Sequence, residues 1–306
     1  MQSPVRPTTI IHAPRLSERL GVDLVLASET FQMTGSFKFR AACHLVGQVA
    51  ATRIIAASSG NFGQALACAC QLAGKNCTIV MPDTSSAVKV EAVRAWGGEV
   101  DMIDTSRISR AERVAELAAA DPQAYVASAY DDPFVIAGNS TLGAELAALD
   151  PMPDAILVPV GGGGLSSGVI TGLRGAGASV PVFGAEPALA NDAARSLAAG
   201  RLIKNEAEPP TIADGARTVS LGQRNWKILK TGLAGIIEVS EEQIAEAVLL
   251  LFLLANLKAE PTGALSLGAL LAEPGRFAGR RICCVVSGGN VDPALYARLI
   301  SGPAQG

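Results

Sequence analysis

Four consecutive glycines, Gly161 to Gly164, follow the apolar segment Ile156–Val160 and precede a stretch with helix-like composition. Glycine has no Cβ, so a run of four presents bare backbone amides that a ligand can approach closely. A turn that serves only to connect a strand to a helix needs one or two glycines. The run therefore predicts a buried strand, a loop that binds a phosphate group, and a helix whose N-terminus faces that phosphate.

Two other functions compete for this segment. Residues Gly164–Gly168 match the G-x-S-x-G turn of serine hydrolases, in which the histidine of the triad follows the serine. Both histidines of the chain, His12 and His44, precede Ser166, so the order of the triad fails.

The segment also allows a dinucleotide-binding oxidoreductase. Glu186 lies 22 residues after Gly164, where such folds place an acid that binds ribose. The glycines do not form a clean G-x-G-x-x-G pattern, and this interpretation leaves the other segments described below unexplained. It is kept as a distant alternative.

Short apolar runs alternate with helix-like stretches along the chain, which predicts an α/β fold with mostly parallel, open twisted sheets covered by helices. The expected strands are Val22–Ala27, Arg53–Ala57, Cys77–Met81, Glu99–Ile103, Ala155–Val160, Val180–Ala185 and Arg281–Val286. The expected helices include Asn61–Leu72, Ser86–Trp96, Ser109–Ala119 and Glu241–Leu257.

Composition excludes several classes of function. The formal charge is −3 and aromatic residues make up 4% of the 306 residues, which argues against a nucleic-acid-binding protein. The longest apolar run, Ala247–Ala255, is far shorter than the ~20 residues of a membrane span. The six cysteines form no C-x-x-C pair and lie in apolar surroundings, which is typical of buried thiols in a reducing compartment. We therefore expect a cytoplasmic enzyme without a signal peptide.

Lys38 is the candidate nucleophile. It lies in the mostly uncharged stretch Thr34–Ala42, with Arg40 two residues further on. Burial and a neighbouring cation lower the pKa of a lysine, and the neutral amine forms Schiff bases. The alternative is a lysine whose stem covers apolar surface while its amine reaches solvent.

Two further loops follow predicted strands. Ser58-Ser59-Gly60-Asn61 precedes a helix and can bind a carboxylate or phosphate, although an ordinary helix cap would have the same composition. Ser287-Gly288-Gly289 ends a strand and leaves one hydroxyl beside backbone with little side-chain bulk, although a simple turn would also fit.

The segment Gly184–Asp192 contains two acids in a loop, Glu186 and Asp192. Two carboxylates and free carbonyl oxygens suit Mg²⁺ or Ca²⁺. Taken alone, two acids in a loop are more often solvated.

Taken in order, these motifs resemble the serine/threonine dehydratase and serine racemase family of pyridoxal-phosphate enzymes, of the tryptophan-synthase-β-like fold (fold type II). The resemblance covers roughly residues 8–299. The motifs that carry it are TGSFKFR, SSGNFGQAL, VIAGNSTLGAE, PVGGGGLSSG, AEPALAND, TIADGART, AEPTGAL and SGGNVD. It implies two domains, a large cofactor-binding domain (residues 1–49 plus 128–306) and a small mobile domain (50–127).

The resemblance also implies roles for individual residues. Lys38 would bind pyridoxal phosphate covalently and act as the catalytic base, with Ser59 on the opposite face of the ring. The other implied cofactor contacts are Phe37, Asn61, Gly161, Gly162, Gly163, Gly164, Leu165 and Ser287. The substrate would contact Ser58, Ser59, Asn61 and Phe62. Glu186, the Ala190 carbonyl and Asp192 would hold a divalent cation.

The implied activity is elimination of ammonia from L-serine, L-threonine or a close β-hydroxy amino acid to give a 2-oxo acid. Alternatives on the same scaffold are a serine or aspartate racemase and a threo-3-hydroxyaspartate dehydratase, for whose second carboxylate Arg107 is a candidate partner. Phe62 and Tyr130 replace the usual His and Asn, and Ala41 replaces a Gly, which leaves the substrate open. The resemblance further suggests a homodimer.

Overall fold

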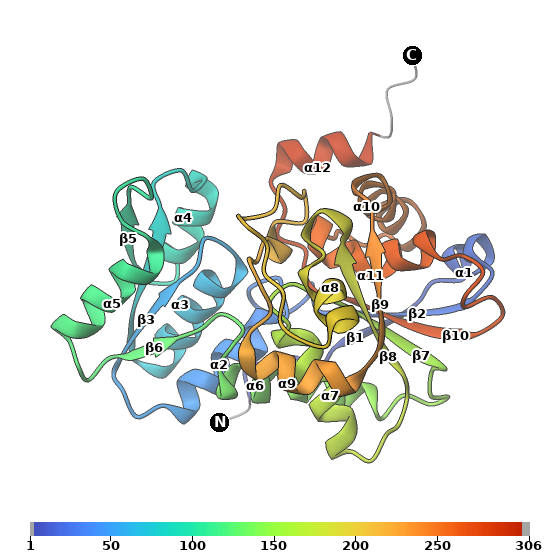
Figure 1. Cartoon of the computed structure of the whole chain (residues 1–306), viewed down its shortest axis with the longest axis horizontal. Helices are drawn as coiled ribbons and strands as arrows, with labels where there is room; N and C mark the ends of the chain where they lie inside the picture. Colours follow the sequence, from blue (N-terminus) through green and yellow to red (C-terminus); the bar gives the residue numbers. More distant parts are fainter. Residues whose placement is uncertain (1–2, 302–306) are drawn as a thin grey trace.

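The computed structural model describes residues 3–301, which form two α/β units that lie side by side (Figure 1). The larger unit is built on a six-stranded sheet in which all neighbouring strands are parallel except the first pair. In sheet order its strands are β1 (Thr9–His12), β2 (Asp23–Ser28), β10 (Arg281–Val286), β7 (Ala155–Pro159), β8 (Val182–Pro187) and β9 (Leu233–Val239).

The smaller unit is a four-stranded, fully parallel sheet. Its strands are, in sheet order, β5 (Glu99–Ile103), β4 (Asn76–Pro82), β3 (Arg53–Ala57) and β6 (Tyr125–Ala127). Buried aliphatic residues on both faces of β3 and β4 explain why helices cover both sides of this sheet.

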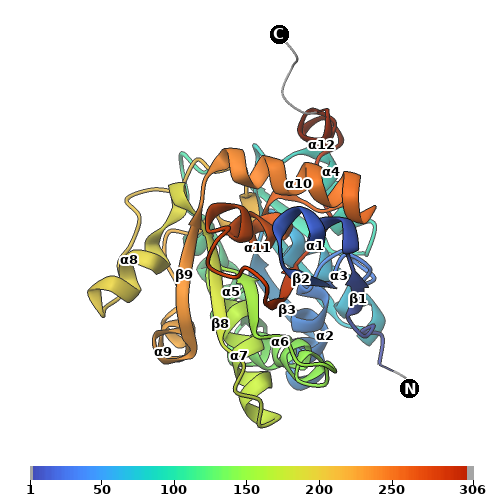
Figure 2. The same ribbon diagram turned by 90° about the vertical axis from the view of Figure 1, so that its right-hand side faces the viewer.

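Helices form the outer layers. The N-terminal half contributes α1 (Pro14–Leu20), α2 (Lys38–Gln48), α3 (Asn61–Ala73), α4 (Ala87–Arg94), α5 (Arg110–Ala120) and α6 (Pro133–Leu146). The C-terminal half contributes α7 (Gly164–Gly175), α8 (Asp192–Ala199), α9 (Gln223–Gly232), α10 (Glu241–Ala255), α11 (Pro261–Ala272) and α12 (Pro293–Ile300), with 3-10 turns at Ala188–Ala190 and Asp214–Ala216. Figure 2 shows α10 and α11 on one side of the large sheet, and α6 and α7 on the other.

The predicted fold class is confirmed, and all seven expected strands are present, three with the predicted bounds and four with small shifts at their ends. The sequence did not predict β1, β6 and β9. All three lie at sheet edges, where a strand has only one neighbour and a less continuous apolar pattern. No helix within residues 3–301 is both long and apolar enough to cross a bilayer.

The domain boundary near residue 50 stays a prediction. Helix α2 lies before it, yet the buried face of α2 packs in the apolar core of the small sheet through Ala42, Leu45 and Val46. Arg40 on α2 forms ion pairs with Glu29 and Glu145, both from the larger unit. Helix α2 is therefore shared between the two units, and Lys38 is its first residue.

Candidate active site

Lys38 lies in a largely apolar setting. Its Nζ is 5.0 Å from the centre of the Phe37 ring and 5.7 Å from that of Phe62, and it donates a hydrogen bond of 2.7 Å to the Ala129 carbonyl oxygen. Burial lowers the pKa of Lys38 to about 8, against a weaker opposite effect of the Glu260 carboxyl. From the sequence we expected the positive charge of Arg40 to lower the pKa of Lys38 as well. In the structure that charge is neutralised by ion pairs with Glu29 and Glu145. Burial is thus the cause of the shift.

The glycine loop connects β7 to α7 and carries free amides. Within residues 3–301 the structure records no hydrogen-bond acceptor for the backbone amides of residues 161–165. The Ser167 amide, further along the helix, donates to the Gly163 carbonyl oxygen. Gly163 has φ +89°, a conformation that favours glycine. A row of unpaired amides at a helix N-terminus is a binding site for an anion such as a phosphate.

Neighbouring segments hold this loop from several sides. A Cβ on Gly162 would lie 2.4 Å from the Tyr130 ring, and one on Gly161 would lie 2.9 Å from Ala216 Cα. The Asn225 side chain donates to both the Gly162 and the Tyr130 carbonyl oxygens, at 2.7 and 3.0 Å. Because Tyr130 follows Ala129, the residue that accepts from Lys38, the amine and the glycine loop share one wall.

The Ser58–Phe62 turn leads from β3 into α3. Ser58 Oγ is already occupied, since it accepts from the amides of Gly60 and Gly63 at 3.3 and 3.0 Å. No acceptor is recorded within residues 3–301 for the amides of Ser59, Asn61 and Phe62. Ser58 therefore shapes the turn, and three amides are free to bind a carboxylate.

Ser287 lies at the end of β10, buried, beside the start of α2. Its carbonyl oxygen accepts from the Phe37 amide at 3.0 Å, and the next residue, Gly288, forms an isolated β-bridge with Ser36. Ser287 and Lys38 are thereby joined through one short stretch of backbone.

Asn61 is hydrogen-bonded by two residues that the sequence did not predict as site residues. Its Nδ2 donates to Glu260 Oε1 at 2.8 Å, and its Oδ1 accepts from Asn290 Nδ2 at 2.8 Å. Both partners belong to motifs used for the family resemblance, AEPTGAL and SGGNVD. Glu260 is a charged residue inside an apolar segment, and this feature of the sequence could have indicated that it is a site residue.

Glu186 and Asp192 are both buried, but they do not lie in the predicted loop: Glu186 belongs to β8, and Asp192 is the first residue of α8. Glu186 accepts from the amides of Ala193 and Ala194, both at 2.9 Å, and Asp192 accepts from the Leu221 amide at 3.0 Å. Burial raises the pKa of Glu186 well above its ordinary value and that of Asp192 to about 6, and the Asp192 charge adds to the shift of Glu186. Two buried carboxylates with oxygen donors fit a hard cation in their chemistry. Within residues 3–301, however, no three His, Cys, Asp or Glu side chains form a group that could hold a metal.

Two other predicted features are settled by their surroundings. Ser166 is fully buried and its Oγ donates to Gly163 O at 3.2 Å, so it does not form an exposed nucleophile turn. The Arg107 side chain is 84% exposed and pairs with Asp104. Arg110, in contrast, pairs with Glu208 across the two units. Burial raises the pKa of Tyr130, and the charge of Arg110 has a smaller, opposite effect.

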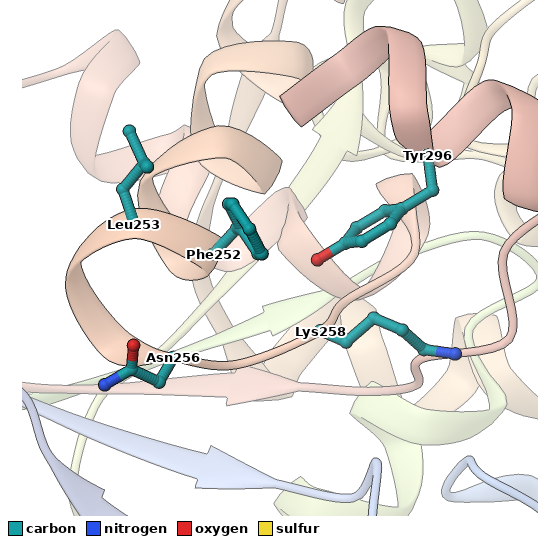
Figure 3. Close-up of a pocket in the computed structure, with 5 residues that line it drawn as sticks. All are labelled: Phe252, Leu253, Asn256, Lys258 and Tyr296. Atoms are coloured by element: carbon teal, nitrogen blue, oxygen red, sulfur yellow. The ribbon is translucent and has the colours of Figure 1, made fainter. Parts of the chain in front are cut away.

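A separate groove of about 540 Å³ lies between α10 and α12. Figure 3 shows Phe252 and Tyr296 facing one another across it, with ring centres 6.2 Å apart. None of its lining residues is a predicted site residue; they are Phe252, Leu253, Asn256, Lys258 and Tyr296.

Comparison with known proteins agrees with this geometry. Residues 1–288 match the family described as pyridoxal-phosphate dependent enzyme, and the chain belongs to that family. It is 34% identical over 306 residues to the L-threo-3-hydroxyaspartate ammonia-lyase of Saccharomyces cerevisiae, covering 99% of this chain and 93% of the relative. Among solved structures, the T.th. threonine deaminase has 40% identity and a TM-score of 0.88 over 94% of each chain. Maize serine racemase has 31% identity and a TM-score of 0.90, over 97% of this chain and 92% of the other.

Proposed function

We propose that this enzyme is a pyridoxal-phosphate-dependent ammonia-lyase that converts a β-hydroxy amino acid to a 2-oxo acid and ammonia. The water lost in the elimination is regained when the resulting imine is hydrolysed, so ammonia is the only net loss. The observation that carries the proposal is the shared wall at Ala129-Tyr130, which joins the half-buried Lys38 amine to the unpaired amides of residues 161–165. A reactive amine and an anion cradle are the two groups that bind this cofactor. The family of the chain and its ammonia-lyase relatives support the same chemistry.

The residues present fit the cofactor. Lys38 would hold it covalently beside Phe37, the amides of Gly161–Leu165 would bind its phosphate, Asn61 its ring hydroxyl, and Ser287 its ring nitrogen. When bound, the cofactor withdraws electrons from the substrate α-carbon and makes the α-proton acidic. A serine hydroxyl at the ring nitrogen does not enforce protonation there, which favours prompt loss of the β-substituent.

Lys38 is the proposed base. With a pKa lowered to about 8, a usable fraction of its amine is neutral near pH 7 and can accept the α-proton. The free amides of Ser59, Asn61 and Phe62 would bind the substrate carboxylate at the N-terminus of α3. That contact orients the α-carbon toward Lys38.

Amino-acid racemisation is the second candidate function. It is supported by the resemblance to maize serine racemase and by a hydroxyl, Ser59, in the turn that would face the substrate from the side opposite Lys38. A proton donor on each face of the α-carbon permits inversion.

A dicarboxylic substrate such as 3-hydroxyaspartate needs a further cation. The predicted Arg107 is exposed and paired within its own turn, so we propose Arg110 in its place, because Arg110 reaches from α5 toward the larger unit and pairs there with Glu208 at 3.3 Å. We expect Arg110→Ala to lower turnover of L-threo-3-hydroxyaspartate at least tenfold more than that of L-serine. Arg107→Ala is the matched control and should leave the ratio of the two unchanged.

Three finer features also stay proposals. Glu186, the Ala190 carbonyl and Asp192 would bind Mg²⁺ or Ca²⁺ with a structural role, supported by the buried pair of carboxylates. A homodimer is suggested by the family resemblance. A cytoplasmic location is suggested by the apolar surroundings of the six cysteines, which are typical of reduced thiols.

The function is tested with the cofactor-loaded enzyme and a panel of L-serine, L-threonine and L-threo-3-hydroxyaspartate. Formation of a 2-oxo acid and ammonia in equal amounts is the expected result. Accumulation of the D-enantiomer without 2-oxo acid would favour the racemase. No reaction with any of the three would contradict both candidates.

A further inference from the structure

We propose that Glu260 is a positioning residue of the active site, which fixes the side-chain amide of Asn61 in one orientation so that a free N–H faces the cofactor. The inference deepens the proposed function and rests on it. It concerns a residue to which neither the sequence motifs nor the fold had assigned a role.

The placement of Glu260 is unusual for a buried acid. It occupies the residue that precedes α11, where a side chain normally caps the helix, but its carboxyl makes no capping bond. Only 4% of the residue is exposed, and Oε1 accepts from Asn61 Nδ2 at 2.8 Å. A buried carboxyl is costly unless it is hydrogen-bonded, so the bond to Asn61 is the main compensation that the site offers.

The backbone of Gly288 lies against Glu260 and restricts the position of its carboxyl group. The Glu260 amide donates to the Gly288 carbonyl oxygen at 3.1 Å, which ties it to the strand end that carries Ser287. A Cβ on Gly288 would lie 2.5 Å from Glu260 Oε1. A side chain at position 288 would therefore displace the carboxyl oxygen that binds Asn61.

The other end of the Asn61 amide is fixed as well. Its Oδ1 accepts from Asn290 Nδ2, which also donates to the Thr34 carbonyl oxygen at 2.7 Å. The Asn290 donor selects this orientation of the amide, because a flip would oppose two N–H groups at that end and would remove the N–H from which Glu260 Oε1 accepts. Asn61 Nδ2 carries two hydrogens and uses one on Glu260, so one N–H remains for the ring hydroxyl.

The charges near Glu260 favour its neutral form. Burial and the Asp214 carboxylate raise its pKa to about 8, while the Asn61 bond and the charges of Lys89 and Lys38 act in the opposite direction. A neutral carboxyl keeps its carbonyl oxygen as an acceptor for Asn61. Glutamine at this position would supply the same acceptor, whereas alanine would not.

The test is a double-mutant cycle read by cofactor affinity. Pyridoxal phosphate is titrated into the apoenzyme, and its dissociation constant is measured for Glu260→Ala, Asn61→Ala and the double variant. We expect each single variant to bind about 3- to 10-fold more weakly, the size of one hydrogen bond. The double variant should bind no more weakly than Asn61→Ala alone, because Glu260 acts through Asn61. Glu260→Gln should retain affinity within about twofold.

Asp132→Ala is the matched control, because Asp132 is also a buried acid that precedes a helix. It should lower the thermal stability of the apoenzyme without changing cofactor affinity. If Glu260→Ala does not fold, Glu260→Met preserves the volume and enters the same cycle. Two results would overturn this inference but leave the proposed function intact. One is a loss of cofactor affinity in the double variant equal to the sum of the two single losses. The other is a loss of affinity in Glu260→Gln equal to that in Glu260→Ala. Unchanged affinity in Asn61→Ala would instead contradict the proposed role of Asn61 and the inference together.

Discussion

The Tyr130 ring packs directly against Gly162, where an added Cβ would lie 2.4 Å from two ring carbons. This contact supports the centre of the glycine loop. Tyr130 directly follows Ala129, whose carbonyl oxygen accepts a hydrogen bond from Lys38. We predict that Gly162→Ala displaces either the loop or the ring and weakens binding of pyridoxal phosphate at least tenfold. The measurement is a cofactor titration of the apoenzyme.

The control for this variant is Gly47→Ala. Gly47 lies within α2 and an added Cβ there meets no atom within 4 Å, so the change should preserve affinity and stabilise the helix slightly. Equal cofactor affinity in Gly162→Ala and the wild type would show that the loop does not bind the phosphate.

The stability of the apoenzyme should depend on pH through Glu260. Its pKa is about 8 in the folded chain against an ordinary value of 4.5, so between these values the folded state holds a proton that the unfolded state releases. Stability therefore falls as pH rises through this window, by up to ~1.4 kcal/mol per pH unit from this group. Lys38 acts in the opposite direction, but only above about pH 8.

Urea unfolding of wild type and Glu260→Gln at pH 5, 6, 7 and 8 measures this effect. The glutamine variant should lack the part of the slope that comes from Glu260, while the parts from Glu186 and Asp192 remain. Parallel curves for the two proteins would contradict a raised pKa at Glu260.

Two ion pairs connect the small unit to the segment around residues 208–214. Lys89 on α4 pairs with Asp214 at 2.6 Å, and Arg110 on α5 with Glu208 at 3.3 Å. Both are partly exposed, and such pairs contribute ~0.2–1 kcal/mol. We predict that Lys89→Glu raises the KM for substrate less than about fivefold, with a larger effect at low salt.

The charge exchange Lys89→Glu with Asp214→Lys should restore most of the wild-type KM. Arg94→Glu serves as the control, because Arg94 pairs with Glu91 on the same helix and does not cross between the units. An equal effect of the Arg94 and Lys89 variants would indicate a general charge effect instead.

Mg²⁺ or Ca²⁺ should stabilise the enzyme through Glu186 and Asp192. Because burial raises the pKa of both acids, protons compete with the cation, and the stabilisation should weaken as pH falls from 8 to 5. The measurement is the Tm in EDTA and in millimolar cation. An identical rise in Tm for wild type and Glu186→Gln would place the cation elsewhere.

The sequence predicted the elements that have a strong local signature. The glycine run and the apolar strands fix β7 and α7 by their own composition, and Lys38, Asn61 and Ser287 fall in segments that meet at one site. Three of the four edge strands, β1, β6 and β9, were missed, whereas the edge strand β5 was predicted with its observed bounds. An edge strand depends on its neighbour as well as on its own pattern, so its sequence alone indicates it less reliably.

Long-range contacts explain what else was missed. Glu260 and Asn61 are 199 residues apart, and nothing in the local sequence indicates that they share a hydrogen bond. Arg107 and Arg110 differ little in sequence context, and only the folded chain separates a cation paired with Asp104 from one that pairs with Glu208 of the larger unit.

The central claim is that Lys38 carries pyridoxal phosphate and that the loaded enzyme eliminates ammonia from a β-hydroxy amino acid. The most direct measurement is the visible spectrum of the loaded enzyme before and after L-serine or L-threo-3-hydroxyaspartate is added. We predict a yellow absorption band that is absent from Lys38→Ala and changes on addition, with a 2-oxo acid formed. A colourless protein that cannot be loaded with pyridoxal phosphate, or a Lys38→Ala variant with the same band and turnover, would contradict the claim.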